Sequence, residues 1–253
     1  MYAGVPIIGI AGGVGSGKSH VARLFGQLGC VVIDSDAQVT EAYALPEVRE
    51  AIRQWWGDAV LLPDGRVDRR AIAARVFASR EERARLEALI HPVVARLRDE
   101  KMHAAVTPVT PVAFVWDTPL LFETGLAAAC DAVVFVDTPR AARVARVRAT
   151  REWDEAELDR RENSQWPLDK KRALSHHVLT NAAADDVTAA VPHPVNPGVP
   201  DGPAGGDPAP LRDQVRRVLS RILTENRGTV AGRGVDFGRK PGPAQSNERR
   251  VGD

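Results

Sequence analysis

The sequence has 253 residues, of which 44% are hydrophobic and 26% are charged, so most of the chain can fold as a soluble α/β globule. Its 34 Lys and Arg residues nearly balance 33 Asp and Glu residues, and the net charge of +1 argues against nucleic acid or an anionic membrane as the main partner. Because we find neither a signal peptide nor an apolar run long enough to span a membrane, we expect a cytoplasmic protein.

A phosphate-binding loop is predicted near the N-terminus. An apolar run at 5–11 indicates a strand, and Val21, Leu24 and Leu28 indicate a helix after the loop. Between them the sequence fits G-x-x-x-x-G-K-[ST], so Lys18 should reach the β- and γ-phosphates of ATP and the Ser19 hydroxyl should bind Mg²⁺. The alternative is a glycine-rich turn with an accidental lysine. The predicted ATP-binding residues of this loop are Gly12, Gly13, Val14, Gly15, Ser16, Gly17, Lys18, Ser19 and His20.

Carboxylates follow two predicted strands, at the end where α/β proteins bind ligands. A buried strand at 30–33 leads into Asp34 and Asp36, and we expect Asp36 to orient an acceptor hydroxyl and take its proton, with Asp34 in a supporting role. The alternative is that one of the two only caps the next helix. Asp117 ends a strand at 112–117 and is predicted to bind Mg²⁺, directly or through water; the alternative is a solvated strand end.

The segment between these strands is predicted to be helical. Apolar spacing indicates helices at about 37–43, 46–56, 67–77 and 81–103. A proline at position 92 should kink the last of these or split it in two.

After Asp117, strands at 132–137 and 177–179 alternate with helices at 139–151 and 154–165, a pattern that predicts a parallel sheet covered on both faces. The first of these helices carries five arginines, of which Arg146 should point to one side of the others' common face. We expect one or two of them to bind phosphates, the alternative being a solvated, ion-paired helix. These arginines are Arg140, Arg143, Arg146, Arg148 and Arg151.

The amino-acid composition of the C-terminal part differs from that of the preceding chain. Residues 191–210 are rich in proline and glycine and are predicted to be a linker insert. Residues 211–226 have apolar positions on one helical face and should dock on the core, whereas 227–253 are predicted to be a disordered tail. The globular domain is therefore expected at 5–190.

The order of these motifs resembles the dephospho-coenzyme A kinases. The likeness includes the phosphate loop, the two aspartates at 34 and 36, Gly65-Arg66-Val67-Asp68-Arg69, Val76-Phe77, His91-Pro92, Pro119-Leu120-Leu121-Phe122-Glu123, Gln165 and Asn181. The resemblance implies a P-loop kinase with a three-layer α/β/α core, a parallel five-stranded sheet, a helical acceptor region at about 37–105 and a lid at about 140–170.

The resemblance also implies an activity: transfer of the γ-phosphate of ATP, with Mg²⁺, to the ribose 3′-hydroxyl of dephospho-coenzyme A, the last step of coenzyme A synthesis. It implies that Asp36 is the base, that Lys18 and the lid arginines Arg146 and Arg148 act on the phosphates, and that Asn181 lies near the adenine of ATP. For the acceptor it implies contacts with Asp36, His91, Leu120 and Phe122.

Two other functions fit parts of the sequence. One is another P-loop kinase for a nucleoside, nucleotide or small alcohol. The other is a non-catalytic nucleotide-binding regulatory protein, although the Asn-Lys-x-Asp base-recognition motif common in such proteins is absent from the sequence. For the favoured function we expect ATP and dephospho-coenzyme A as partners, and a monomer or weak oligomer.

Overall fold

The computed structural model describes residues 1–106, 109–182 and 210–231. Its centre is a parallel sheet of five strands in the order β2-β3-β1-β4-β5. The predicted parallel five-stranded sheet is therefore confirmed. The strands are β1 (Ile7–Gly12), β2 (Val31–Asp34), β3 (Phe114–Asp117), β4 (Ala132–Asp137) and β5 (His177–Thr180).

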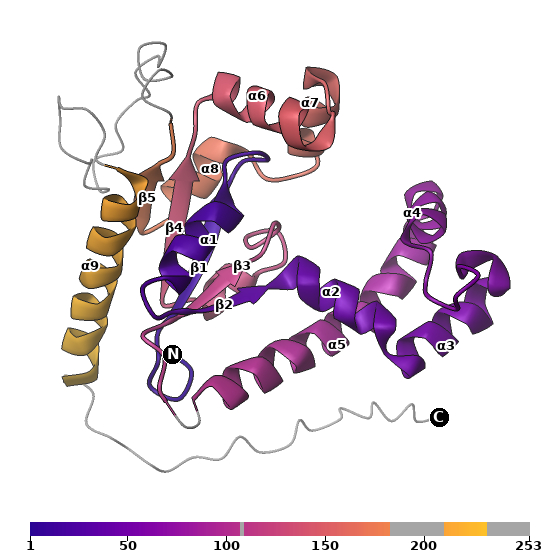
Figure 1. Cartoon of the computed structure of the whole chain (residues 1–253), viewed down its shortest axis with the longest axis horizontal. Helices are drawn as coiled ribbons and strands as arrows, with labels where there is room; N and C mark the ends of the chain where they lie inside the picture. The colour runs from indigo at the N-terminus through magenta and orange to yellow at the C-terminus, as the bar shows by residue number, and fades with distance from the viewer. Residues whose placement is uncertain (107–108, 183–209, 232–253) are drawn as a thin grey trace, which may run out of the picture.

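Helices connect the strands and extend the chain beyond the sheet (Figure 1). Helix α8, which follows a Trp-Pro pair, is an element that the apolar pattern did not predict. The helices are α1 (Lys18–Gly26), α2 (Ser35–Ala44), α3 (Pro46–Trp56), α4 (Arg69–Ala78), α5 (Arg80–Ala105), α6 (Arg140–Arg151), α7 (Glu155–Asn163), α8 (Leu168–Ala173) and α9 (Leu211–Ala231), with 3-10 turns η1 (Asp58–Val60) and η2 (Leu126–Ala129).

The two faces of the sheet bury alternate side chains of the same strands, which makes three layers. On one face, Ile8 and Ile10 of β1 pack with Phe25 of α1 and Leu219 of α9. On the other face, apolar side chains of the strands pack with the end of α5 and with residues 166–168. Burial on both faces explains why these strands read as continuous apolar runs.

Helices α2 to α5 form a lobe to one side of the sheet, with an apolar core of its own (Figure 1). Helix α5 is continuous through Pro92, so the predicted split is wrong. The reason is packing: Ile90 and Leu97, on either side of the proline, are both buried in this same core, and their burial holds the helix together despite one missing hydrogen bond.

Helix α9 lies against α1 and β5, with Val215, Leu219 and Ile222 buried in the main core. It continues to Ala231, so the prediction that helix ends at 226 and tail begins at 227 is wrong by about a turn. The predicted linker, apart from Pro210, and the tail from 232 onward lie outside the described residues. Among the described helices, none is long and apolar enough to cross a lipid bilayer.

Candidate active site

The phosphate loop joins β1 to α1 and depends on glycine at particular points. Gly17 is the N-cap of α1 and has a positive φ of 88°. Gly15 has φ 75°, and a Cβ there would lie 2.9 Å from Val147 Cγ1 and 3.0 Å from the Arg143 carbonyl oxygen of α6. Glycine is therefore needed both for the left-handed backbone and for the close approach of the lid helix.

The Lys18 side chain folds back over this loop. Its Nζ donates to the carbonyl oxygens of Gly12 at 3.1 Å and Gly13 at 3.0 Å. Burial lowers the pKa of Lys18 to about 8, although the nearby Asp117 carboxylate works in the opposite direction. Among the described residues, the amine donates hydrogen bonds to two neutral carbonyl oxygens only, and phosphate oxygens at the loop would hold its proton more strongly.

The predicted carboxylates meet at the carboxyl ends of β2 and β3. Asp34 and Asp117 are partners in the register of these strands, and Asp117 is also the partner of Ile10 at the end of β1. Burial raises the pKa of Asp117; a hydrogen bond from the Ser19 hydroxyl lowers it, and the charges of Asp34 and Asp36 raise it further. The carboxyl ends of β2 and β3 therefore bring Asp34, Asp36 and Asp117 close to Ser19, so that these side chains affect the pKa of Asp117.

Asp34 and Asp36 have different surroundings because α2 begins immediately after Asp34. Asp34 caps the helix, and its Oδ1 accepts from the Ala37 backbone N–H at 3.0 Å. Asp36 lies in the first turn and is exposed. The capping alternative that the sequence left open thus describes Asp34, while the carboxylate of Asp36 is accessible to a ligand.

The residues at this edge suit a hard divalent cation. Ser19 and Asp117 offer oxygen atoms, and a divalent cation would offset the neighbouring negative charges that raise the pKa of Asp117. Among the described residues, no three His, Cys, Asp or Glu side chains come together as a metal site. This agrees with the chemistry of Mg²⁺, which is commonly held by one or two protein oxygens together with substrate phosphates.

On the opposite side of the loop, three donors converge on the Ser16 carbonyl oxygen. These are Asn181 Nδ2 at 2.7 Å, Thr138 Oγ1 at 2.9 Å and Arg146 Nη1 at 3.3 Å. Arg146 Nη2 also donates to the Asn181 carbonyl oxygen at 2.9 Å. The lid helix and the end of β5 therefore meet at the phosphate loop, and Thr138 is a member of this group that the sequence did not indicate.

The arginines of α6 divide between the phosphate loop and ion pairs within the lid. Arg146, expected to one side of the others, is the one that donates to the loop. Arg143 is buried, pairs with Glu162 and donates to the Thr138 carbonyl oxygen at 3.2 Å. Arg148, also predicted to act on phosphates, is exposed and pairs with Glu155 at 3.2 Å within the lid. Arg146 and Arg148 are two positions apart, so a helix turns their side chains to opposite sides.

Besides Asp36 on α2, the predicted acceptor contacts lie on α5 and in the turn after β3. His91 is exposed on α5, which packs against α2. Leu120 is 40% exposed, whereas Phe122 is largely buried and stacks on Trp166, with ring centroids 6.1 Å apart. Phe122 therefore has a packing partner within the protein, and of the last two only Leu120 has an exposed side chain.

An ion pair with a buried lysine, not foreseen in the sequence, lies beside Phe122. Lys171 of α8 is 2% exposed and pairs with Glu123 Oε1 at 2.7 Å. The same carboxylate accepts from the Trp166 backbone N–H at 2.8 Å, and Lys171 also donates to Gln165 Oε1 at 2.9 Å. These contacts attach the segment after β3 to the segment that returns from the lid.

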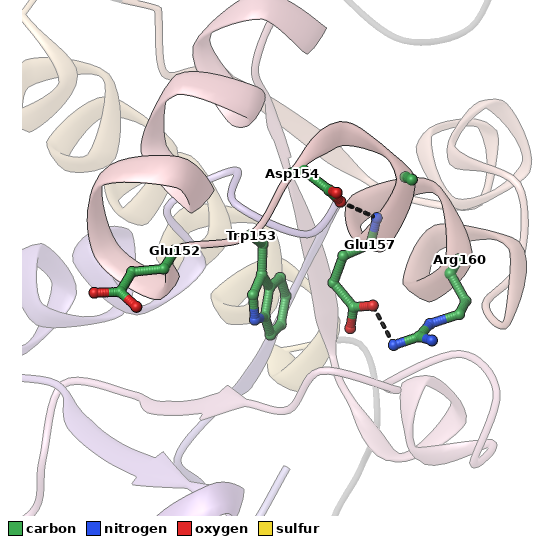
Figure 2. Close-up of a pocket in the computed structure, with 6 residues that line it drawn as sticks. Glu152, Trp153, Asp154, Glu157 and Arg160 are labelled. Carbon is green, nitrogen blue, oxygen red and sulfur yellow. Dashed lines mark hydrogen bonds and ion pairs between the residues drawn. The ribbon is translucent and has the colours of Figure 1, made fainter.

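The lid has a shallow pocket of its own between α6 and α7 (Figure 2). Trp153 lies in it, with the Arg151 and Arg161 guanidinium groups over its ring at 4.7 and 4.1 Å. Two of its charged lining residues, Arg160 and Glu157, form an ion pair. No phosphate-loop residue lines this pocket, so it is separate from the site described above.

Comparisons with known proteins agree on one family. The family model "Dephospho-CoA kinase" matches residues 6–186. A dephospho-CoA kinase of Anaeromyxobacter dehalogenans is 40% identical over 185 residues, which are 72% of this chain and 87% of that protein. One from Thermobifida fusca is 38% identical over 181 residues, 71% of this chain and 88% of that protein.

Solved structures give a consistent result. The protein TT1252 from Thermus thermophilus is 32% identical with a TM-score of 0.66, covering 87% of this chain and 97% of that one. A dephospho-CoA kinase from Campylobacter jejuni is 18% identical with a TM-score of 0.52, covering 87% of this chain and 98% of that one, and supports the fold alone.

Proposed function

Since the chain belongs to the dephospho-CoA kinase family, we propose that it transfers the γ-phosphate of ATP to the ribose 3′-hydroxyl of dephospho-coenzyme A, giving coenzyme A and ADP. The observation that carries this proposal is the position of Asp36. Its exposed carboxylate follows the end of β2 and contributes to the charge around Asp117, which is hydrogen-bonded to Ser19 of the phosphate loop. An acceptor hydroxyl at Asp36 would thus lie beside the phosphates of ATP.

The phosphate loop binds the triphosphate through its backbone N–H groups and the N-terminus of α1. Lys18 exchanges its bonds to the loop carbonyls for bonds to the β- and γ-phosphate oxygens. Ser19 and Asp117 would hold Mg²⁺, which supplies charge neutralisation to those oxygens when bound. Arg146, held at the loop by Ser16 and Asn181, adds a cation on the lid side.

Asp36 acts on the acceptor. Its carboxylate accepts a hydrogen bond from the 3′-hydroxyl and so aims that oxygen at the γ-phosphorus. As the new O–P bond forms and the bond to the β-phosphate oxygen breaks, the hydroxyl proton passes to Asp36 and ADP leaves. Because phosphoryl transfer has a largely dissociative transition state, proton transfer is late and orientation contributes as much as basicity.

The test is ADP release with ATP and Mg²⁺ across a panel of alcohols: dephospho-coenzyme A, adenosine, shikimate and gluconate. We expect kcat/KM for dephospho-coenzyme A to exceed that of the others by roughly a hundredfold or more. A higher value for another alcohol would support another small-molecule kinase, and slow hydrolysis with no acceptor consumed would support a regulatory protein. We further propose that the enzyme works in the cytoplasm as a monomer or weak oligomer.

A further inference from the structure

Arg69, the first residue of α4, contacts α2, the helix whose first turn contains Asp36. Its Nη1 donates to Thr40 Oγ1 at 3.1 Å, and Thr40 Oγ1 in turn donates to the Asp36 carbonyl oxygen at 2.9 Å. The Arg69 guanidinium also lies over the Tyr43 ring, 5.9 Å from its centroid. Two contacts from α2 therefore hold this cation within about one helical turn, roughly 6 Å along the axis, of the proposed base.

The Arg69 guanidinium has N–H groups that make no hydrogen bond to the described residues. Two exposed arginines of this lobe pair with carboxylates, Arg53 with Asp58 at 2.6 Å and Arg66 with Asp64 at 2.7 Å. Arg69 makes no ion pair with any carboxylate of the described residues, and one of its five N–H groups bonds to Thr40. An exposed, anchored guanidinium with free donors has the geometry that binds phosphate groups through paired hydrogen bonds.

We propose that Arg69 is an acceptor-binding residue that holds the 5′-diphosphate of the acceptor nucleotide. This inference rests on the proposed function, because a ribose placed with its 3′-hydroxyl at Asp36 carries that diphosphate with it. Thr40 and Tyr43 fix the position of Arg69 relative to Asp36, so binding of the diphosphate also sets the distance of the 3′-hydroxyl from the base. Arg69 thereby selects a nucleoside diphosphate ester over a bare nucleoside.

The experiment compares Arg69→Met and Arg69→Lys with wild type. The matched control is Arg70→Met, the next residue on α4, which is also exposed and whose side chain points about 100° further around the helix. For each protein, KM is measured for dephospho-coenzyme A and for ATP, together with the inhibition constant of adenosine against dephospho-coenzyme A.

We expect Arg69→Met to raise KM for dephospho-coenzyme A roughly 10- to 100-fold, with Arg69→Lys recovering part of the loss. KM for ATP and the adenosine inhibition constant should stay within about twofold of wild type, and Arg70→Met should resemble wild type. A larger change in KM for ATP would assign Arg69 to the nucleotide instead. An unchanged KM for dephospho-coenzyme A, or an equal rise in Arg70→Met, would overturn the inference.

These outcomes are distinct from a failure of the proposed function. If the wild-type protein does not phosphorylate dephospho-coenzyme A, the function is wrong and the inference falls with it. If wild type does so and Arg69→Met matches it, only the role of Arg69 is wrong.

Discussion

Asp34 and Asp117 lie opposite each other at the carboxyl ends of β2 and β3, and only Asp117 is hydrogen-bonded to Ser19 of the phosphate loop. The two neighbouring carboxylates therefore have different roles. Asp34 caps α2 and so fixes where that helix starts. Asp117 is buried with a raised pKa, next to Lys18 and Ser19, where the phosphates of ATP are expected.

The position of Asp117 predicts a role with the metal ion. Replacing Asp117 by Asn removes the charge beside Ser19 and should lower kcat/KM on the order of a hundredfold. The concentration of Mg²⁺ needed for half-maximal activity should rise in the same variant. Asp99→Asn, an exposed change on α5, serves as the control. A variant with wild-type Mg²⁺ dependence would show that Asp117 does not bind the metal.

The low pKa of Lys18 predicts a dependence of stability on pH. The folded protein binds the Lys18 proton less tightly, with a pKa near 8 against 10.5 for the ordinary side chain. Between these pH values the unfolded chain holds more protons, so the free energy of unfolding should rise with pH. The expected gain, relative to Lys18→Met, is roughly 3 kcal/mol without nucleotide.

Denaturant unfolding from pH 7.5 to 10.5 measures this effect, and Lys101→Met, on the exposed side of α5, is the control. Saturating ATP should abolish the difference, because phosphate oxygens retain the proton. Parallel pH curves for wild type and Lys18→Met would contradict the account of Lys18. Lys18→Met should also lose about a thousandfold or more in turnover.

The buried pair of Lys171 and Glu123 predicts a large effect on stability. Lys171→Met leaves the partly buried Glu123 carboxylate without its cation and should cost about 3 kcal/mol of unfolding free energy. Lys170→Met, one residue away and stacked over Trp166 at 3.7 Å, should cost about 1 kcal/mol or less.

Chemical denaturation of the double variant Glu123→Gln/Lys171→Met separates pairing from packing. The double variant should regain at least half of the unfolding free energy that Lys171→Met loses. The amide that replaces the Glu123 carboxylate has no charge but keeps an oxygen that accepts from the Trp166 N–H. If the loss of unfolding free energy in the double variant equals the sum of the losses in the two single variants, Lys171 does not stabilise the protein through its ion pair with Glu123.

The parts of the fold that depend on local sequence were predictable. The phosphate loop, the strand before it and the helix after it follow from spacing and turn chemistry, and the structure has them where the sequence placed them. Of the two effects predicted for Pro92, the split does not occur, because its local cost is outweighed by burial of Ile90 and Leu97, which depends on contacts with other helices.

The site was less predictable, because it depends on which faces of the helices and strands pack against each other. Spacing on α6 cannot say which arginine contacts the loop; that is decided by Val147 packing against Gly15, which brings Arg146 toward Ser16. Lys171 and Glu123 are far apart in sequence, and nothing local marks them as partners. Which of Asp34 and Asp36 caps the next helix depended on where α2 starts, and the hydrogen bond from the Ala37 N–H identifies Asp34 as the cap.

The central claim, that Asp36 is the acceptor base, is tested most directly by the turnover number with dephospho-coenzyme A in Asp36→Asn and Asp34→Asn, with ATP affinity measured by calorimetry for both. We predict that Asp36→Asn keeps its ATP affinity but loses roughly a hundredfold or more in turnover, and that Asp34→Asn loses less. If Asp34→Asn loses turnover while Asp36→Asn does not, or if Asp36→Asn loses ATP affinity at unchanged turnover, Asp36 is not the base.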